Sequence, residues 1–407
     1  VALVPVPSAD GAVIVSRNGR AVSWLGRDAG RTVLRSQDVG RRFSNVDVTP
    51  DGKWVLLWTR DGEPLDEGTE GLVALVDLVQ LRAGTPSPPL ERAAGRRLTI
   101  PDEYTDLSTR EAVAPPAANF VLLRSLASPA LAVFDVATRT FSSVTLAAAP
   151  TDLDLSPDGT FAIAVLRSLS KVVWFPLPAA LTDPGVLRTA DVALPANDCD
   201  DDVTPCVAAP GQAELSPDGT SAALFTTARV VEAFATLTFD SGATRTYTSL
   251  KKRIRTLGIA PDGTRVLTVH QPQPDSTVAD PYERDVDVQH GYSLVDLAEG
   301  FAQLKLTGTV APLEFVFTSS GRFATVTLRD DATKRHFADA IDLDTLVVTP
   351  LALASAPQFA GAFPGSPGDD RAWVTQVHPA GRISFLDLAT KVVRTATGYE
   401  LNSEIER

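Results

Sequence analysis

The chain has 407 residues and a formal net charge of −13 at neutral pH, which argues against a nucleic-acid partner because nucleic acids are themselves negative. Hydrophobic residues make up 44% of the chain, enough for a large core. They never form a run of eighteen or more, so the sequence predicts no membrane-spanning helix.

A short turn motif recurs along the chain and predicts a repeat protein. Clear copies read Thr-Pro-Asp-Gly at 49–52, Ser-Pro-Asp-Gly at 156–159 and 216–219, and Ala-Pro-Asp-Gly at 260–263. Weaker copies lie at 8–11, 318–321 and 365–368, and a degraded copy lies at 114–123. Asp and Gly favour a tight hairpin turn because they tolerate positive φ. Counting all copies gives eight units of about fifty residues, the period typical of propeller blades.

A second phrase recurs in each unit: an apolar strand that ends in Asp, followed by a small polar turn. It is clearest at 131–138 and 383–390, and similar segments lie at 72–78, 292–297 and 340–343. A shorter alternating strand follows, so each unit predicts four antiparallel strands. We therefore expect an all-β fold, a single β-propeller with four-stranded antiparallel blades.

Eight blades are the main prediction, with seven blades and one irregular unit as the alternative because 50–66 and 83–105 are irregular. The expected blade limits are 1–38, 43–105, 106–148, 150–195, 211–250, 255–308, 312–353 and 357–397. Residues 398–407 would form a closing or extension strand, since an open ring leaves sheet edges exposed.

The segment 132–165, AVFDVATRTFSSVTLAAAPTDLDLSPDGTFAIAV, resembles the YVTN-type and Tol-Pal-type propeller repeats. In those repeats an "xVxDxAT" strand precedes an "xxxSPDGxxxxV" hairpin. The resemblance is close in about half of the units and implies a propeller fold. It implies little about activity, because propellers include enzymes, scaffolds and receptors.

Insertions between strands are expected to gather on the blade face opposite the Pro-Asp-Gly turns. Three long loops join second to third strands at 61–71, 271–291 and 329–336, and a fourth at 196–212 joins two units. Grouped carboxylates are costly unless they are solvated, paired or bound to a cation. The loops could therefore bind calcium, dock a basic partner, or simply be solvated. The carboxylates that carry these hypotheses are Asp61, Glu63, Asp66, Glu67, Asp198, Asp200, Asp201, Asp202, Asp275, Asp280, Glu283, Asp285 and Asp287.

The two cysteines, Cys199 and Cys206, lie in the acidic segment 197–206 and predict a local disulfide in an oxidising compartment. Two unpaired thiols are the alternative. The Asp spacing begins like an EF-hand loop but then fails, because Val203 replaces the required Gly and Ala209 the bidentate Glu. The chain starts at Val1 and has no methionine, which we interpret as a mature chain without its signal peptide. The expected location is secreted, periplasmic or cell-surface.

Catalytic signals are weak. The sequence has no G-x-S-x-G nucleophile elbow and no H-E-x-x-H motif. Two of its four histidines lie at the ends of second strands, and the other two border long loops. The enzymatic alternative is therefore a metal site at the channel mouth, as in lactonase-like or metal-dependent propellers. The candidate ligands are His270, His290, His336 and His378.

The preferred prediction is a non-catalytic scaffold or adhesion module that binds a protein or envelope component through the acidic loops. No cofactor is firmly expected, and calcium is the candidate. Self-assembly through outer strand edges, and origin as a fragment of a larger surface protein, remain open at this point.

Overall fold

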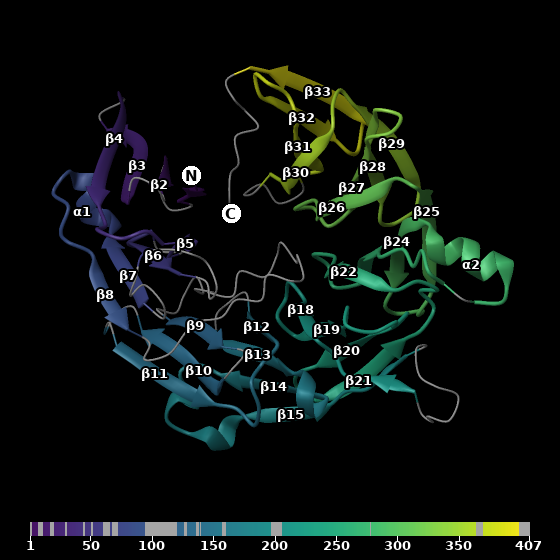
Figure 1. Ribbon diagram of the computed structural model, residues 1–407, viewed down its shortest axis with the longest axis horizontal. Helices are drawn as coiled ribbons and strands as arrows, with labels where there is room; N and C mark the ends of the chain where they lie inside the picture. Colours follow the sequence, from purple (N-terminus) through teal and green to yellow (C-terminus); the bar gives the residue numbers. More distant parts are fainter. Residues whose placement is uncertain are drawn as a thin grey trace. The chain divides into compact units, whose positions relative to one another are not determined.

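Antiparallel meanders follow one another along the chain in the computed structural model (Figure 1). Eight such sheets are described, seven with four strands and one with three, and an additional strand pair lies between two of them in the sequence. The prediction of an all-β, eight-bladed propeller is confirmed. The structure describes residues 2–6, 11–16, 20–28, 31–43, 45–49, 52–59, 66, 72–93, 120–125, 128–135, 138, 140–156, 160–196, 206–276, 278–363 and 369–398.

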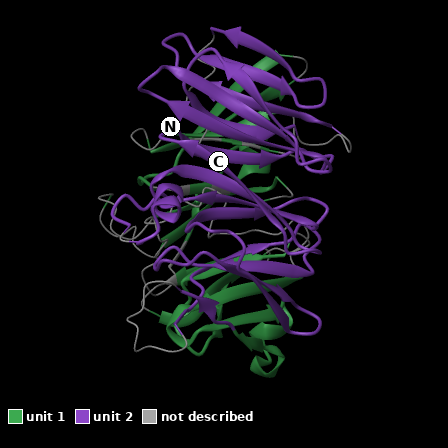
Figure 2. Ribbon diagram, turned by 90° about the vertical axis from the view of Figure 1, so that its right-hand side faces the viewer, with its two compact units in different colours: residues 1–191, 404–407 green, residues 192–403 purple. Residues whose placement is uncertain are grey.

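Two compact units divide the chain near residue 192 (Figure 2). Their strands pair in chain order within each sheet. The first unit contains four sheets: β1 (Ala2–Pro5), β2 (Gly11–Ser16), β3 (Ala21–Asp28) and β4 (Arg31–Asp38); β5 (Asn45–Val48), β6 (Trp54–Trp58), β7 (Leu72–Asp77) and β8 (Leu90–Ala93); β9 (Phe120–Ser125), β10 (Ser128–Asp135) and β11 (Thr140–Thr145); and β12 (Asp152–Leu155), β13 (Phe161–Leu166), β14 (Lys171–Pro176) and β15 (Arg188–Asp191). Its helices are α1 (Leu78–Ala83) and the short 3-10 turns η1 (Arg167–Leu169), η2 (Ala179–Leu181) and η3 (Pro184–Val186).

The second unit contains the strand pair and four sheets. They are β16 (Leu194–Pro195) and β17 (Val207–Ala208); β18 (Gln212–Leu215), β19 (Ser221–Phe225), β20 (Phe234–Thr238) and β21 (Ala243–Tyr247); β22 (Ile254–Ile259), β23 (Arg265–His270), β24 (His290–Asp296) and β25 (Ala302–Gly308); β26 (Ala311–Phe317), β27 (Phe323–Asp330), β28 (Arg335–Asp342) and β29 (Val348–Leu353); and β30 (Pro357–Ala362), β31 (Arg371–Gln376), β32 (Arg382–Asp387) and β33 (Val392–Thr397). Its helix is α2 (Pro281–Val288). The predicted extension strand falls almost wholly outside the described residues, and the single-domain organisation stays a prediction.

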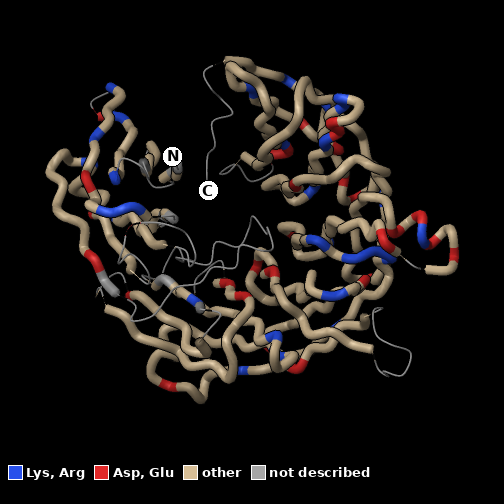
Figure 3. The backbone as a smooth tube through the Cα atoms, in the orientation of Figure 1, with Lys and Arg blue, Asp and Glu red and all other residues tan. Residues whose placement is uncertain are grey.

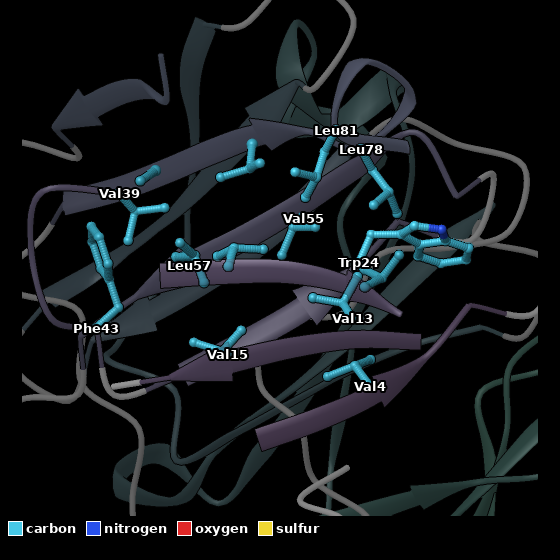
Figure 4. Close-up of a cluster of buried hydrophobic side chains, with 14 of the residues drawn as sticks. Val4, Val13, Val15, Trp24, Val39, Phe43, Val55, Leu57, Leu78 and Leu81 are labelled. Atoms are coloured by element: carbon cyan, nitrogen blue, oxygen red, sulfur yellow. The ribbon is translucent and has the colours of Figure 1, made fainter. Parts of the chain in front are cut away.

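Apolar cores lie between successive sheets within each unit. In the first unit, Trp24, Val13 and Val15 of β2 and β3 pack against Val55 and Leu57 of β6 (Figure 4). In the second unit, comparable clusters join β22–β25 to the sheets before and after it. Burial on both faces explains why the central strands are almost continuously apolar.

The recurrent turn motif has the conformation that its composition predicts. In each of the copies at 49–52, 216–219 and 260–263, the amide of the final Gly donates to the carbonyl of the first residue. Gly219 has φ +69°, a value that costs glycine little. Asp218 accepts hydrogen bonds from Ser216 Oγ at 2.6 Å and from the Thr220 amide at 3.1 Å, which fixes the turn.

Two sequence predictions about the connections need correction. Residues 329–336 were expected to form a long loop, but β27 and β28 pair as far as Asp330 and Arg335, leaving a four-residue turn. The predicted loop at 271–291 is a long insertion, but it contains α2 and ends where β24 begins at His290. Among the helices that the structure describes, none is long and apolar enough to cross a membrane.

Candidate functional site

The insertion between β23 and β24 is the best-defined candidate site. Its helix α2 begins after Asp280, whose carboxylate accepts a hydrogen bond from the Tyr282 amide at 2.8 Å. Pro281 occupies the first turn, where its missing N–H costs nothing. This Asp-Pro start explains locally why a helix forms in a segment with little apolar periodicity.

A buried lysine from the preceding inter-blade connection holds the other end of α2. Lys252 is 0% exposed, and its Nζ donates to the carbonyls of Val286 at 2.5 Å and Asp287 at 3.0 Å. A cation at a helix C-terminus is favourable because the last carbonyls carry partial negative charge. Burial lowers the pKa of Lys252, while nearby Asp287 opposes that shift. The contact joins two connections that the sequence placed on the same blade face.

The outer surface of the insertion is acidic and carries an exposed aromatic ring. Tyr282 is 83% exposed, and Asp275, Glu283 and Asp285 are exposed as well. The cation Arg284 folds back, with its guanidinium donating to the carbonyl of Val278 at 3.0 Å. In Figures 1 and 3, α2 projects beside β24 and β25 with acidic residues along it.

The five predicted carboxylates of this insertion have different environments. Asp280 caps α2, and Asp285 accepts a hydrogen bond from Gln289 Nε2 at 2.9 Å. Asp287 is buried and accepts a hydrogen bond from Ser276 Oγ. Asp275 and Glu283 remain on the exposed surface.

The first predicted acidic loop is mostly outside the described residues, which include only Asp66. That carboxylate pairs with Arg42 at 2.9 Å and Arg20 at 3.2 Å. A hydrogen bond from the Arg42 amide is the largest cause that lowers the pKa of Asp66. Asp66 therefore stabilises a local ion-pair network. Asp61, Glu63 and Glu67 lie outside the described residues.

The cysteine loop is likewise described only at its end. The Cys206 carbonyl accepts a hydrogen bond from the Ala196 amide at 3.1 Å beside the β16–β17 pair. Because Cys199 lies outside the described residues, its pairing with Cys206 stays a prediction. Calcium binding in this loop also stays a prediction, since Asp198, Asp200, Asp201 and Asp202 are outside the described residues too.

His270 is committed to the blade interior. It is 1% exposed, and its Nε2 lies 2.7 Å from Ser293 Oγ while its Nδ1 lies 3.3 Å from the Arg253 carbonyl. The final blade has an equivalent contact, in which Gln376 at the end of β31 donates through Nε2 to Ser384 Oγ of β32. Since an amide performs the same task there, the contact of His270 is structural.

The other three histidines lie on different elements. His290 begins β24, His336 lies in β28, and His378 follows β31 with its Nδ1 accepting a hydrogen bond from the Ala380 amide at 3.1 Å. Burial is the main cause that lowers the pKa of both His290 and His336. Within the described parts of the chain, no three His, Cys, Asp or Glu residues form a group that could hold a metal ion.

Sequence reasoning missed two residues of the insertion site, Lys252 and Tyr282. The basic run at 251–255 was a usable signal, because four cations in five residues are conspicuous in an acidic chain. The exposure of Tyr282 had no sequence signal, because a tyrosine in a loop is equally compatible with burial.

No protein-family model and no curated protein matches the chain. Solved structures share its fold. A eukaryotic initiation factor is 12% identical, with a TM-score of 0.55 over 97% of this chain and 88% of that one. Dihydro-heme d1 dehydrogenase NirN, in complex with DHE, is 15% identical, with a TM-score of 0.50 over 97% and 74%. Kuenenia stuttgartiensis hydrazine synthase is 14% identical, with a TM-score of 0.45 over 92% and 99%. At these identities the likeness to the initiation factor and to NirN shows the fold alone.

Proposed function

We propose that the chain is a non-catalytic binding module whose docking element is the α2 insertion. The observation that carries this proposal is Tyr282, which is 83% exposed on a helix whose far end is anchored by the fully buried Lys252. Exposed tyrosines are frequent contact residues in protein interfaces, because they offer a large amphipathic surface at a low entropic cost.

The anchoring of α2 matters because a rigid docking element loses little entropy on binding. Lys252 fixes the C-terminal turn, and the Asp280 cap fixes the N-terminal turn. Tyr282 and Glu283 are therefore presented in one orientation. This arrangement favours recognition over a flexible, solvated loop.

The charge of the insertion favours a cationic partner. Lys252 lies beside the buried Asp287, whereas Asp275, Glu283 and Asp285 face solvent. Arg284 is held against the backbone, so it offsets these charges without covering them. A basic segment with an arginine or apolar side chain could pair with the carboxylates and pack on the Tyr282 ring.

The biological setting is part of the same proposal. A scaffold or adhesion role at the cell surface, in the periplasm or outside the cell agrees with the acidic balance and the closely spaced cysteine pair. Assignment to the YVTN-type or Tol-Pal-type repeats rests on the turn motif, as at 216–219.

A binding experiment with a short labelled peptide of Lys, Arg and Leu tests the docking element. Fluorescence anisotropy should show binding that weakens as ionic strength rises above ~0.1 M. Tyr282→Ala should weaken it by about tenfold, the effect of a moderate interface contact. Glu283→Gln combined with Asp285→Asn should weaken it by a similar factor.

The matched control is Glu299→Gln combined with Asp344→Asn, which removes the same charge from two exposed positions outside the insertion. Near-native affinity is expected for this control. Equal weakening in the control and the α2 variants would show only a general charge effect and refute the docking site. Equal binding of a Glu/Leu peptide would refute the cationic partner.

A further inference from the structure

A run of basic residues spans the last residues before β22 and the start of that strand, in the second unit. Figure 3 shows cations gathered in this region. Lys251, Lys252, Arg253 and Arg255 fall within five residues of a chain whose net charge is −13. Lys252 is the buried anchor of α2. Lys251 is exposed, and the two arginines are half-buried.

The arginines in this run are paired with backbone carbonyls. Arg255 Nη2 donates to the carbonyls of Pro312 at 2.9 Å and Leu313 at 2.8 Å, and Arg253 Nη2 donates to the Thr227 carbonyl. In the described part of the chain, no ion pair joins Arg253 or Arg255 to a carboxylate. Carbonyls satisfy hydrogen bonds but leave the positive charge uncompensated.

Two β-bulges lie at the same end of this sheet. One inserts Arg255 between Ile254 and Thr256 on β22, and the other inserts Thr307 on β25 opposite His290 and Gly291 of β24. A Cβ at Gly291 would lie 2.6 Å from the Lys305 carbonyl oxygen, so the close approach of β24 and β25 beside the second bulge requires glycine. Bulges redirect side chains and are frequent near functional sites.

His290 is the other half-buried donor in this region. Its Nδ1 is buried without a hydrogen-bond partner. His290 begins β24, a strand in contact with β26, and Arg255 reaches β26 through its hydrogen bonds to Pro312 and Leu313. Burial is the main cause that lowers the pKa of His290, and the charges of Arg255 and Lys252 lower it further. Arg253 Nε is also buried without a partner. The region therefore combines excess positive charge with unused donors.

We propose that Arg255 and His290 bind a small oxyanion, a phosphate or a carboxylate group, at the bulged end of sheet β22–β25. The guanidinium and the imidazole would supply charge-assisted hydrogen bonds, which are stronger than neutral ones. The bound anion would compensate the cations of the run. This site uses none of the α2 surface that carries the docking proposal.

Isothermal titration with inorganic phosphate, and separately with acetate, tests the site at matched ionic strength. Arg255→Gln and His290→Gln should each weaken the affinity for the anion by about tenfold or more, because each variant removes one charge-assisted contact. Lys251→Gln is the matched control for Arg255→Gln, because it removes one exposed charge from the same run. Tighter binding of phosphate or of acetate identifies which source of the oxyanion the site prefers.

Equal weakening in Lys251→Gln would overturn the proposal, since it would reduce the effect to surface charge. Absence of saturable binding by both anions would also overturn it. If Arg255→Gln unfolds because the Pro312 and Leu313 carbonyls lose their hydrogen-bond donor, His290→Gln decides the question. As an independent readout, the NMR signals of His290 should titrate at a higher pH with the preferred anion present, and an unchanged titration would contradict the site.

Discussion

Acidification should destabilise the second unit through His270. Burial lowers the pKa of His270 from its usual 6.5 to about 3, and the hydrogen bond to the Arg253 carbonyl only partly opposes this. The folded protein therefore keeps the ring neutral while the unfolded chain binds a proton below pH 6.5. The contribution of His270 to stability is complete above that pH and is lost as pH falls from 6.5 towards 3.

The size of the effect follows from the two pKa values. Each unit of pH between them costs about 1.4 kcal/mol, so at pH 5 the loss relative to pH 7.5 is about 2 kcal/mol. Solvent does not screen this free-energy cost, because the His270 side chain is 1% exposed. His290 and His336 shift in the same direction, so the whole protein should lose more than His270 alone explains.

The variant His270→Gln isolates the contribution, because Gln376 makes the equivalent contact to Ser384 in the final blade. Urea unfolding followed by tryptophan fluorescence should show about 2 kcal/mol less acid sensitivity in His270→Gln between pH 7.5 and 5. His378→Gln is the matched control for the loss of one imidazole, because His378 lies at a partly exposed position outside the core. An acid sensitivity unchanged by His270→Gln would refute the reasoning.

Two further substitutions probe buried charges of the second unit. Lys252→Met keeps the apolar stem but leaves the Val286 and Asp287 carbonyls without a donor. We therefore expect the free energy of unfolding in urea to fall by about 2–4 kcal/mol. A fall of less than about 1 kcal/mol would contradict the anchoring role. Asp339→Asn removes the carboxylate that accepts from Tyr292 Oη at 2.8 Å and Lys305 Nζ at 2.6 Å, and should cost about 2 kcal/mol. A double-mutant cycle with Lys305→Met checks this cost, since additive losses would show that the ion pair contributes nothing.

Much of the fold was predictable because its signals are local. The turn at 216–219 carries its own hydrogen bonds, with Ser216 and Asp218 closing the hairpin around Gly219. The strand-ending Asp of the second phrase also acts locally, since Asp342 accepts from the amides of Asp344 and Thr345. Residues within a few positions of one another determine both features, so repetition of the motif gave the blade count.

The candidate sites were less predictable because their partners are distant in sequence. The acidity of 271–291 was visible, but Lys252 is 34 residues from Val286, and its contact depends on how two connections meet. The expected loop at 329–336 was wrong because backbone pairing of β27 and β28 outweighed the polar composition of their ends. His270 could have been a ligand or a core residue by sequence, and only its bond to Ser293 distinguished the two.

The sequence by itself determined the repeat, the strand order and the acidic balance, because turn chemistry and apolar periodicity act between neighbouring residues. Tertiary structure decided which charges are exposed and which are buried and paired inside the fold. Asp287 and Glu283 have similar sequence surroundings, yet the first is buried beside Lys252 and the second faces solvent. The physical reason is that the environment of a charge depends on packing between segments that are distant in sequence, and composition does not predict which of these segments meet.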